Sequence, residues 1–406
     1  MFKHVQFLFA GLLCLMLSAC GGPGGQVSSG PNMTSLAVVS NDPNAMPNIG
    51  WQNQSDRKEL NQATAVPARK VKVAMLLPLT GKHADLGQSM WKAAQMALFD
   101  VGSANFEMVP KDTQSTSAGA SQAAQEAANA GAQMFLGPIF AEDVRAVKPV
   151  SSARNIPMVA FTTDWTLGGG DTYILGFLPF AQVARVAQYA QTHGADRIAV
   201  YAPTTPYCDA VIGTLGRTGI SPVAVGRYSP QQADLSAQVA AFAASSKDKF
   251  NALLLPVGGE GLRSLTSVLS SNGINSRNTR FLGTGLWDES SLTGDPSLYG
   301  GWFAAPDPAS RRDFERRYNE NYGGSPLRLS SLAYDATALA AVLARSGGDA
   351  PYSRERLHNP RGFAGIDGIF RFRNDGLSER GLAVLEIQSG RARVIDPAPT
   401  AFLAGS

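Results

Sequence analysis

Charged residues are scarce in this chain and nearly balanced in sign. They make up 17% of the 406 residues, and 35 Lys and Arg stand against 32 Asp and Glu, which leaves a net charge of +3. There is no long basic run, so we expect no nucleic acid partner. The apolar share of 44% is typical of a globular protein.

The common sequence signatures of catalysis are missing. The chain has no Gly-x-Ser-x-Gly elbow, no His-Glu-x-x-His pair and no Gly-Lys-Ser/Thr phosphate loop. His83, His193 and His358 are scattered, without cysteine or aspartate at metal-ligand spacing. We therefore expect no enzymatic activity, no catalytic residues, no cofactor and no metal.

The first twenty residues have the pattern of an export signal. A basic start precedes an apolar run at 5–16 that is too short to span a bilayer as a mature helix. Residues 17–20 resemble the cleavage site of a bacterial lipoprotein signal, which implies that residues 1–19 are removed and Cys20 is acylated. Gly21 replaces the aspartate of many inner-membrane lipoproteins, which implies the outer membrane, facing the periplasm. The inner membrane, an uncleaved anchor and a plain secretory signal are the alternatives.

Cysteine is scarce as well, with three residues in the chain. Cys14 would leave with the signal and Cys20 would carry lipid, so Cys208 has no partner for an intramolecular disulfide. We interpret Cys208 as a small buried hydrophobic residue that opens an apolar helix. Residues 20–69 are rich in Gly, Pro, Ser, Asn and Gln without sustained periodicity, which predicts a flexible lipidated tether.

From residue 71 onward, strand patterns alternate with helical patterns. This order requires crossover connections and predicts mostly parallel sheets that are covered on both faces. The first series predicts strands at 71–77, 106–109, 133–136 and 157–161, with helices around 90–98, 118–130 and 142–152. The second predicts strands at 197–201, 223–228, 252–256 and 280–282, with helices at 180–192, 208–217, 235–245 and 261–271. We therefore predict an α/β fold of two doubly wound parallel-sheet lobes joined by a hinge.

The last hundred residues are expected to complete both lobes. Helical patterns occur at 310–321 and 332–345, and paired strand-like runs at 368–372 and 382–387 flank a tight-turn signal at 374–376. We assign residues 70–178 and 304–378 to the N-terminal lobe, residues 179–303 and 379–397 to the C-terminal lobe, and residues 398–406 to a tail.

Short motifs follow a consistent order over residues 71–396. They are 73–81 (VAMLLPLTG), 87–88 (GQ), 136–138 (LGP), 156–159 (IPMV), 334–336 (YDA) and 363–368 (FAGIDG). Together they resemble the type I periplasmic binding proteins, which include the leucine/isoleucine/valine receptors. Residues 283–288, 301–306 and 380–384, with the lipoprotein-like start, look most similar to the penicillin-binding-protein activators. That resemblance implies a receptor-like fold that regulates cell-wall synthases by contact.

Candidate ligand-binding residues follow from strand ends. In open α/β sheets, ligands bind beyond the carboxyl ends of the strands, where hydroxyls and backbone amides suit a carboxylate and an acidic side chain suits an ammonium. The candidates are Thr80, Gly81, Phe140, Thr162, Thr163, Tyr207, Glu260 and Trp287. Structural interpretations stay open: Thr162 and Thr163 as helix caps, Glu260 as a charge at a helix N-terminus, and Trp287 as loop packing.

Two functions fit these observations. The first is a non-enzymatic regulator of a penicillin-binding protein, favoured by Gly21, the long tether and Phe140–Ala141 where amino-acid receptors usually have a serine. The second is the substrate-binding lipoprotein of an ABC importer, which would deliver an amino acid or a similar small polar solute to an ABC permease. In both, only the lipid anchor would touch the membrane, and a ligand that contacts both lobes would stabilise the closed state.

Overall fold

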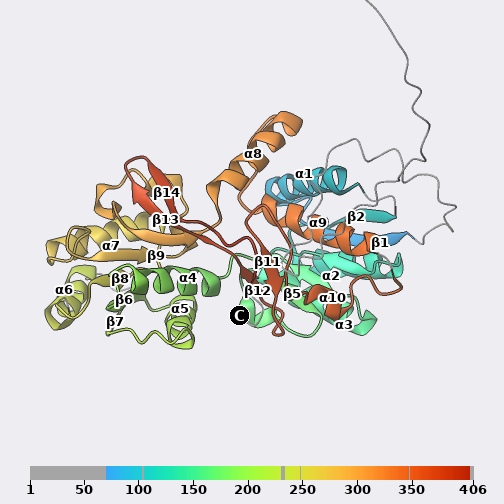
Figure 1. The fold of residues 1–406 in the computed structure, drawn as a ribbon. Coiled ribbons are helices and arrows are strands. Elements are labelled where there is room, and N and C mark those ends of the chain that lie inside the picture. The colour runs from blue at the N-terminus through green and yellow to red at the C-terminus, as the bar shows by residue number, and fades with distance from the viewer. Residues whose placement is uncertain (1–69, 103–104, 230–233, 247, 347, 403–406) are drawn as a thin grey trace, which may run out of the picture. The chain divides into compact units, whose positions relative to one another are not determined.

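The computed structural model describes residues 70–102, 105–229, 234–246, 248–346 and 348–402. The expected signal, lipidation site and tether lie outside these residues. Among the described helices, none combines the length and the apolar character that a membrane crossing requires. Two sheets organise the described residues into two lobes, one sheet with five strands and one with seven (Figure 1). The prediction of an α/β fold with two doubly wound lobes is confirmed.

The first sheet is wholly parallel, in the order β2-β1-β3-β4-β5. Its strands are β1 (Val71–Leu77), β2 (Phe106–Asp112), β3 (Met134–Leu136), β4 (Met158–Ala160) and β5 (Thr172–Ile174). Helices α1 (Ala84–Val101) and α9 (Ser330–Arg345) cover one face, and α2 (Ser117–Asn129) and α3 (Ala141–Arg154) cover the other. Alternate residues of β1 therefore pack into two cores, Met75 toward α1 and α9 and Leu76 toward α2 and α3.

The second sheet runs β14-β13-β10-β9-β8-β6-β7. Five strands repeat the parallel order of the first sheet: β6 (Ile198–Pro203), β7 (Ala224–Tyr228), β8 (Ala252–Leu254), β9 (Arg280–Gly283) and β10 (Trp302–Ala305). Two antiparallel strands, β13 (Ala383–Gln388) and β14 (Arg391–Asp396), extend it. Helices α4 (Pro179–Thr192) and α5 (Pro206–Arg217) pack on one face, and α6 (Leu235–Ser246) and α7 (Gly259–Ser271) on the other.

The expected pairing of residues 368–372 with 382–387 is wrong. Strand β11 (Phe370–Phe372) pairs with β12 (Ser378–Arg380), whereas β13 pairs with β10 and β14. The tight turn at 374–376 places Ser378 directly opposite Phe372, so the residues immediately after the turn pair with β11. Residues 383–388 are then available to join the second sheet. Strand β10 also continues to Ala305, two residues past the lobe boundary that we expected.

Helix α8 (Pro308–Tyr322) joins the two halves of the chain after β10. Its apolar residues Phe314 and Tyr318 pack with α1 and α9 in one hydrophobic cluster. Helices α1 and α9 lie side by side along the first sheet (Figure 1). Helix α8 thus holds Arg311, in its first turns, near the first lobe. There Arg311 contacts Asp288, in the loop that follows β9 of the second lobe.

Candidate functional site

A cavity of about 430 Å³ has walls from both lobes. Most of its lining is apolar, with few polar groups, as is usual for small-molecule sites. The lining residues are Thr163, Trp165, Phe177, Pro179, Gln182, Tyr207, Gly285, Leu286, Asp288, Ala305, Pro306 and Arg328.

The cavity lies where strands of both sheets end. Thr163 follows β4 in the first lobe, and Asp288 follows β9 in the second. Tyr207 stands at the start of α5, directly after β6, and Ala305 closes β10. These are carboxyl ends of parallel strands, so the cavity has the position that ligand sites take in open α/β sheets.

Two charged residues line the cavity, and both are paired. The Asp288 Oδ2 atom lies 3.2 Å from Arg311 Nη1 and 3.9 Å from Arg328 Nη2. Arg328 also pairs with Asp367, at 3.1 Å, and its guanidinium lies 4.0 Å from the centre of the Phe177 ring. Burial raises the pKa of Asp288 above its ordinary value, although both arginines oppose the shift.

A further ion pair, Arg380 with Asp335, is buried near the cavity wall, and the Arg380 guanidinium lies 5.3 Å from the centre of the Phe177 ring. Arg380 Nη1 is 3.6 Å from Asp335 Oδ2, and neither side chain is more than 5% exposed. The backbone N–H of Ile366 donates to Asp335 Oδ1 at 2.7 Å. Burial raises the pKa of Asp335, and the attraction of Arg380 offsets the shift only in part.

Three uncharged residues of the cavity, Tyr207, Gln182 and Gly285, also form hydrogen bonds within the protein. The Tyr207 hydroxyl donates to Thr284 Oγ1 at 2.9 Å, and burial raises its pKa to about 12. The backbone N–H of Gly285 donates to Gln182 Oε1 at 2.8 Å. These bonds hold the loop after β9 against α4 and α5, so the second-lobe wall is fixed by its own contacts.

Of the eight predicted ligand-binding residues, Thr163 and Tyr207 line the cavity. Thr162 is buried beside them, and its Oγ1 accepts from the N–H of Asp164 at 3.1 Å, which is a capping role. Glu260 is 80% exposed and pairs with Arg263 on α7, at 3.1 Å.

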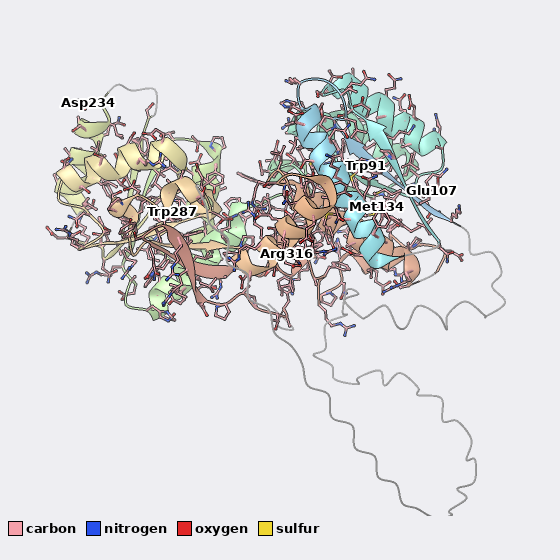
Figure 2. The ribbon with its side chains drawn as sticks, turned by 90° about the horizontal axis from the view of Figure 1, so that it is seen from above. Trp91, Glu107, Met134, Asp234, Trp287 and Arg316 are labelled. Carbon is pink, nitrogen blue, oxygen red and sulfur yellow. The ribbon has the colours of Figure 1, made fainter. Side chains whose placement is uncertain are left out.

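Trp287 has no exposed surface and packs in the second-lobe core, where Figure 2 labels it. Its Nε1 donates to the carbonyl of Val257 at 3.0 Å. This is a packing role.

The other three predicted residues form a separate group at the ends of β1 and β3. Thr80 donates from its hydroxyl to Asp112 Oδ2 at 2.6 Å. Gly81 follows with a φ of +82°, a left-handed conformation that favours glycine. The Phe140 ring lies 4.4 Å from the His83 ring at a tilt of 38°, and Phe140 precedes α3 without a side-chain cap. None of the three is among the lining residues of the cavity, and their ligand roles stay predictions.

We expect Thr80→Val to lower the free energy of unfolding by about 1 kcal/mol, because the Asp112 carboxylate loses a charge-assisted hydrogen bond at an exposed site. Burial alone would raise the pKa of Asp112, but hydrogen bonds from the Thr80 hydroxyl and three backbone amides lower it below its ordinary value. Urea unfolding should show this loss above the ordinary pKa of an aspartate. Thr80→Ser is the control, and equal losses in both variants would contradict the role of the hydroxyl.

Four important cavity residues escaped sequence reasoning. Arg328 lies between α8 and α9, away from any strand end, and its position depends on tertiary packing alone. Phe177 and Gln182 belong to the segment that enters the second lobe, which had no polar strand-end signal. Trp165 was detectable in principle, because it is an aromatic residue two positions after the predicted Thr163.

Comparison with known proteins identifies the fold. A family model described as periplasmic binding protein matches residues 70–392. A search of curated proteins found no match. Among solved structures, one described as a branched-chain amino acid ABC transporter from Rhodospirillum rubrum has a TM-score of 0.68 at 19% identity, covering 80% of this chain and 100% of its own.

Two further similar structures differ in function from each other, according to their descriptions. The C-domain of LpoA from Haemophilus influenzae, described as a regulator of PBP1A, has a TM-score of 0.62 at 16% identity, covering 80% of this chain and 99% of its own. A solute binding protein of an ABC transporter from R. palustris, in complex with benzoate, has a TM-score of 0.56 at 14% identity, covering 83% and 98%. At these identities the likeness shows the fold alone. The matched family and these structures are binding proteins and a regulator.

Proposed function

Because this chain belongs to the periplasmic binding protein family, we propose that it is a non-enzymatic lipoprotein that regulates a penicillin-binding protein by direct contact. The observation that carries this proposal is the pairing of the charged cavity residues. Asp288, the carboxylate in the cavity wall, is held by Arg311 and Arg328. A free amino acid would need such a carboxylate for its ammonium group.

The first lobe supports the same conclusion. Phe140 precedes α3 without a side-chain cap, in the loop where amino-acid receptors usually have a serine, and its ring makes a tilted contact with the His83 ring. Glu260, the acidic residue expected to meet an ammonium, pairs with Arg263 outside the cavity lining. At the predicted positions, the cavity therefore has no unengaged carboxylate for the ammonium group of an amino acid, which favours a regulator over an amino-acid receptor.

The proposed location is the periplasmic face of the outer membrane, with the inner membrane as the alternative. It depends on the sequence of the first 21 residues, where an apolar run ends at Cys20 and glycine follows. Two or more acyl chains on Cys20 would give stable anchoring, because one chain alone binds a bilayer only marginally. Residues 20–69 would then let the folded lobes reach a synthase in the periplasm.

A penicillin-labelling experiment tests the regulator. The full-length chain with an affinity tag is crosslinked reversibly in cells and purified from membranes that have been treated with a fluorescent penicillin. We expect a labelled penicillin-binding protein to copurify, and glycan polymerisation by that protein to rise when the chain is added. A matched Cys20→Ala variant should lose the interaction in cells but keep it with the purified synthase. Absence of any labelled band above the untagged control contradicts the proposal.

The importer remains a second candidate because the cavity has walls from both lobes and a volume suited to a small solute. A thermal-shift screen with leucine and valine separates the two functions. A receptor at 100 times its Kd would gain about 2.7 kcal/mol of stability. We expect no shift, and a clear shift that Asp288→Ala abolishes would favour the importer.

A further inference from the structure

The walls of the cavity combine aromatic and aliphatic surface from both lobes. Trp165 and Phe177 come from the first lobe, and Tyr207 and Leu286 from the second. Leu286 is 45% exposed, so its side chain has apolar surface in the cavity wall that a ligand could cover. A ring inserted between these side chains would bury apolar surface on two sides, and such burial is the main source of affinity in small-molecule sites.

The charges around the cavity form an alternating chain. Arg311 contacts Glu315 at 2.9 Å and Asp288 at 3.2 Å. Arg328 then stands between Asp288 and Asp367, at 3.9 and 3.1 Å. Each charged group in this series has a neighbour of opposite charge. A charged ligand group would therefore have to break an existing ion pair or remain uncompensated in a partly buried place.

The size of the cavity sets a limit on the occupant. Benzene fills an apolar cavity of about 150 Å³ in other proteins. A volume of about 430 Å³ therefore has room for one or two rings with a short polar substituent. The exposed Thr163 and the Tyr207 oxygen offer hydrogen bonds to such a substituent without any charge.

We propose that this cavity binds an uncharged aromatic molecule of one or two rings, which contacts both lobes. The proposal goes beyond the regulatory function and does not depend on a penicillin-binding protein, so the two can fail separately. A ligand held by Trp165 and Phe177 on one side and by Leu286 on the other would stabilise one arrangement of the lobes, and through it the surface that a partner meets.

Four indole compounds that share a ring and differ in charge test the proposal. They are tryptophol (neutral), indole acetate (anionic), tryptamine (cationic) and tryptophan (zwitterionic), each titrated by calorimetry into the purified full-length chain. We expect tryptophol to bind at least about tenfold more tightly than the other three, a difference of about 1.4 kcal/mol. Tighter binding of any charged compound, or no binding of tryptophol, overturns the proposal.

A matched pair of leucine variants locates the site, and a third variant tests the role of charge. Leu286→Ala should weaken tryptophol binding about threefold to tenfold, while Leu327→Ala, whose side chain is also 45% exposed but does not line the cavity, should leave it unchanged. Asp288→Asn removes the carboxylate between Arg311 and Arg328 and should raise the affinity for indole acetate relative to tryptophol by at least about tenfold. An unchanged charge preference in Asp288→Asn, with folding verified by circular dichroism, contradicts the argument from pairing.

Discussion

Trp287→Ala is expected to lower the free energy of unfolding by about 3–5 kcal/mol, the usual cost of removing a large aromatic side chain from a core. The ring has no exposed surface and lies in one cluster with Leu262, Phe281 and Phe303. Its loss would leave a cavity that these neighbours can fill only in part, and would also leave the carbonyl of Val257 without its donor. Urea unfolding followed by circular dichroism measures the change.

Trp287→Phe is the control for this prediction. It keeps most of the ring volume and removes the hydrogen bond to Val257, so we expect a smaller loss of about 1–2 kcal/mol. Trp165→Ala, at a partly exposed ring in the cavity wall, should cost less than Trp287→Ala. A cost below about 1 kcal/mol for Trp287→Ala would contradict a core position and reopen a ligand role.

Trp287 also shows why sequence reasoning identified a loop that lines the cavity but not the residues of that loop that line it. The pattern after β9 placed Trp287 and Asp288 at a strand end, and the loop does border the cavity. A short 3-10 turn over Gly285–Trp287 directs the tryptophan inward and leaves the next residue at the wall. The indole packs over Gly283, where any side chain would collide with the ring. Such packing depends on contacts distant in sequence, which periodicity does not report.

The fold was more accessible to sequence reasoning than the site. Strand β1 matches the predicted residues 71–77 because a buried parallel strand reads as one unbroken apolar run. Strands β5 and β12 were not predicted, and β12 consists of Ser378, Glu379 and Arg380, which form no apolar pattern. Arg328 shows the same limit in the site, since only the packing of α9 and β11 brings it to Asp367 and the cavity.

Arg380→Leu is the other substitution for which we expect a large effect, a loss of about 3–5 kcal/mol near neutral pH. The substitution leaves the Asp335 carboxylate buried without its cation, and breaking a buried pair by removing one partner has this cost. The carbonyl of Leu175 also loses a donor, at 3.2 Å. The double variant Asp335→Asn with Arg380→Leu removes both charges and keeps an acceptor for the N–H of Ile366, so it should recover much of the stability.

The pH dependence gives this prediction a second, independent readout. Burial raises the pKa of Asp335 in the folded protein above the ordinary value of 3.8, near which the unfolded carboxyl titrates. Between these two pKa values the folded state binds more protons than the unfolded state, so the free energy of unfolding falls as pH rises, by up to about 1.4 kcal/mol per pH unit.

Removing Arg380 takes away the charge that opposes this shift, so in Arg380→Leu the free energy of unfolding should continue to fall up to a higher pH than in the parent protein. The loss relative to the parent protein should therefore be larger at about pH 8 than at about pH 5, because protonation at low pH removes the charge that Arg380 compensates. In the Asp335→Asn background the titrating group is absent, so the loss caused by Arg380→Leu should be the same at both pH values. Equal losses at both pH values in Arg380→Leu would mean that the cost arises from lost packing on Phe177 and Phe370 and not from an uncompensated charge.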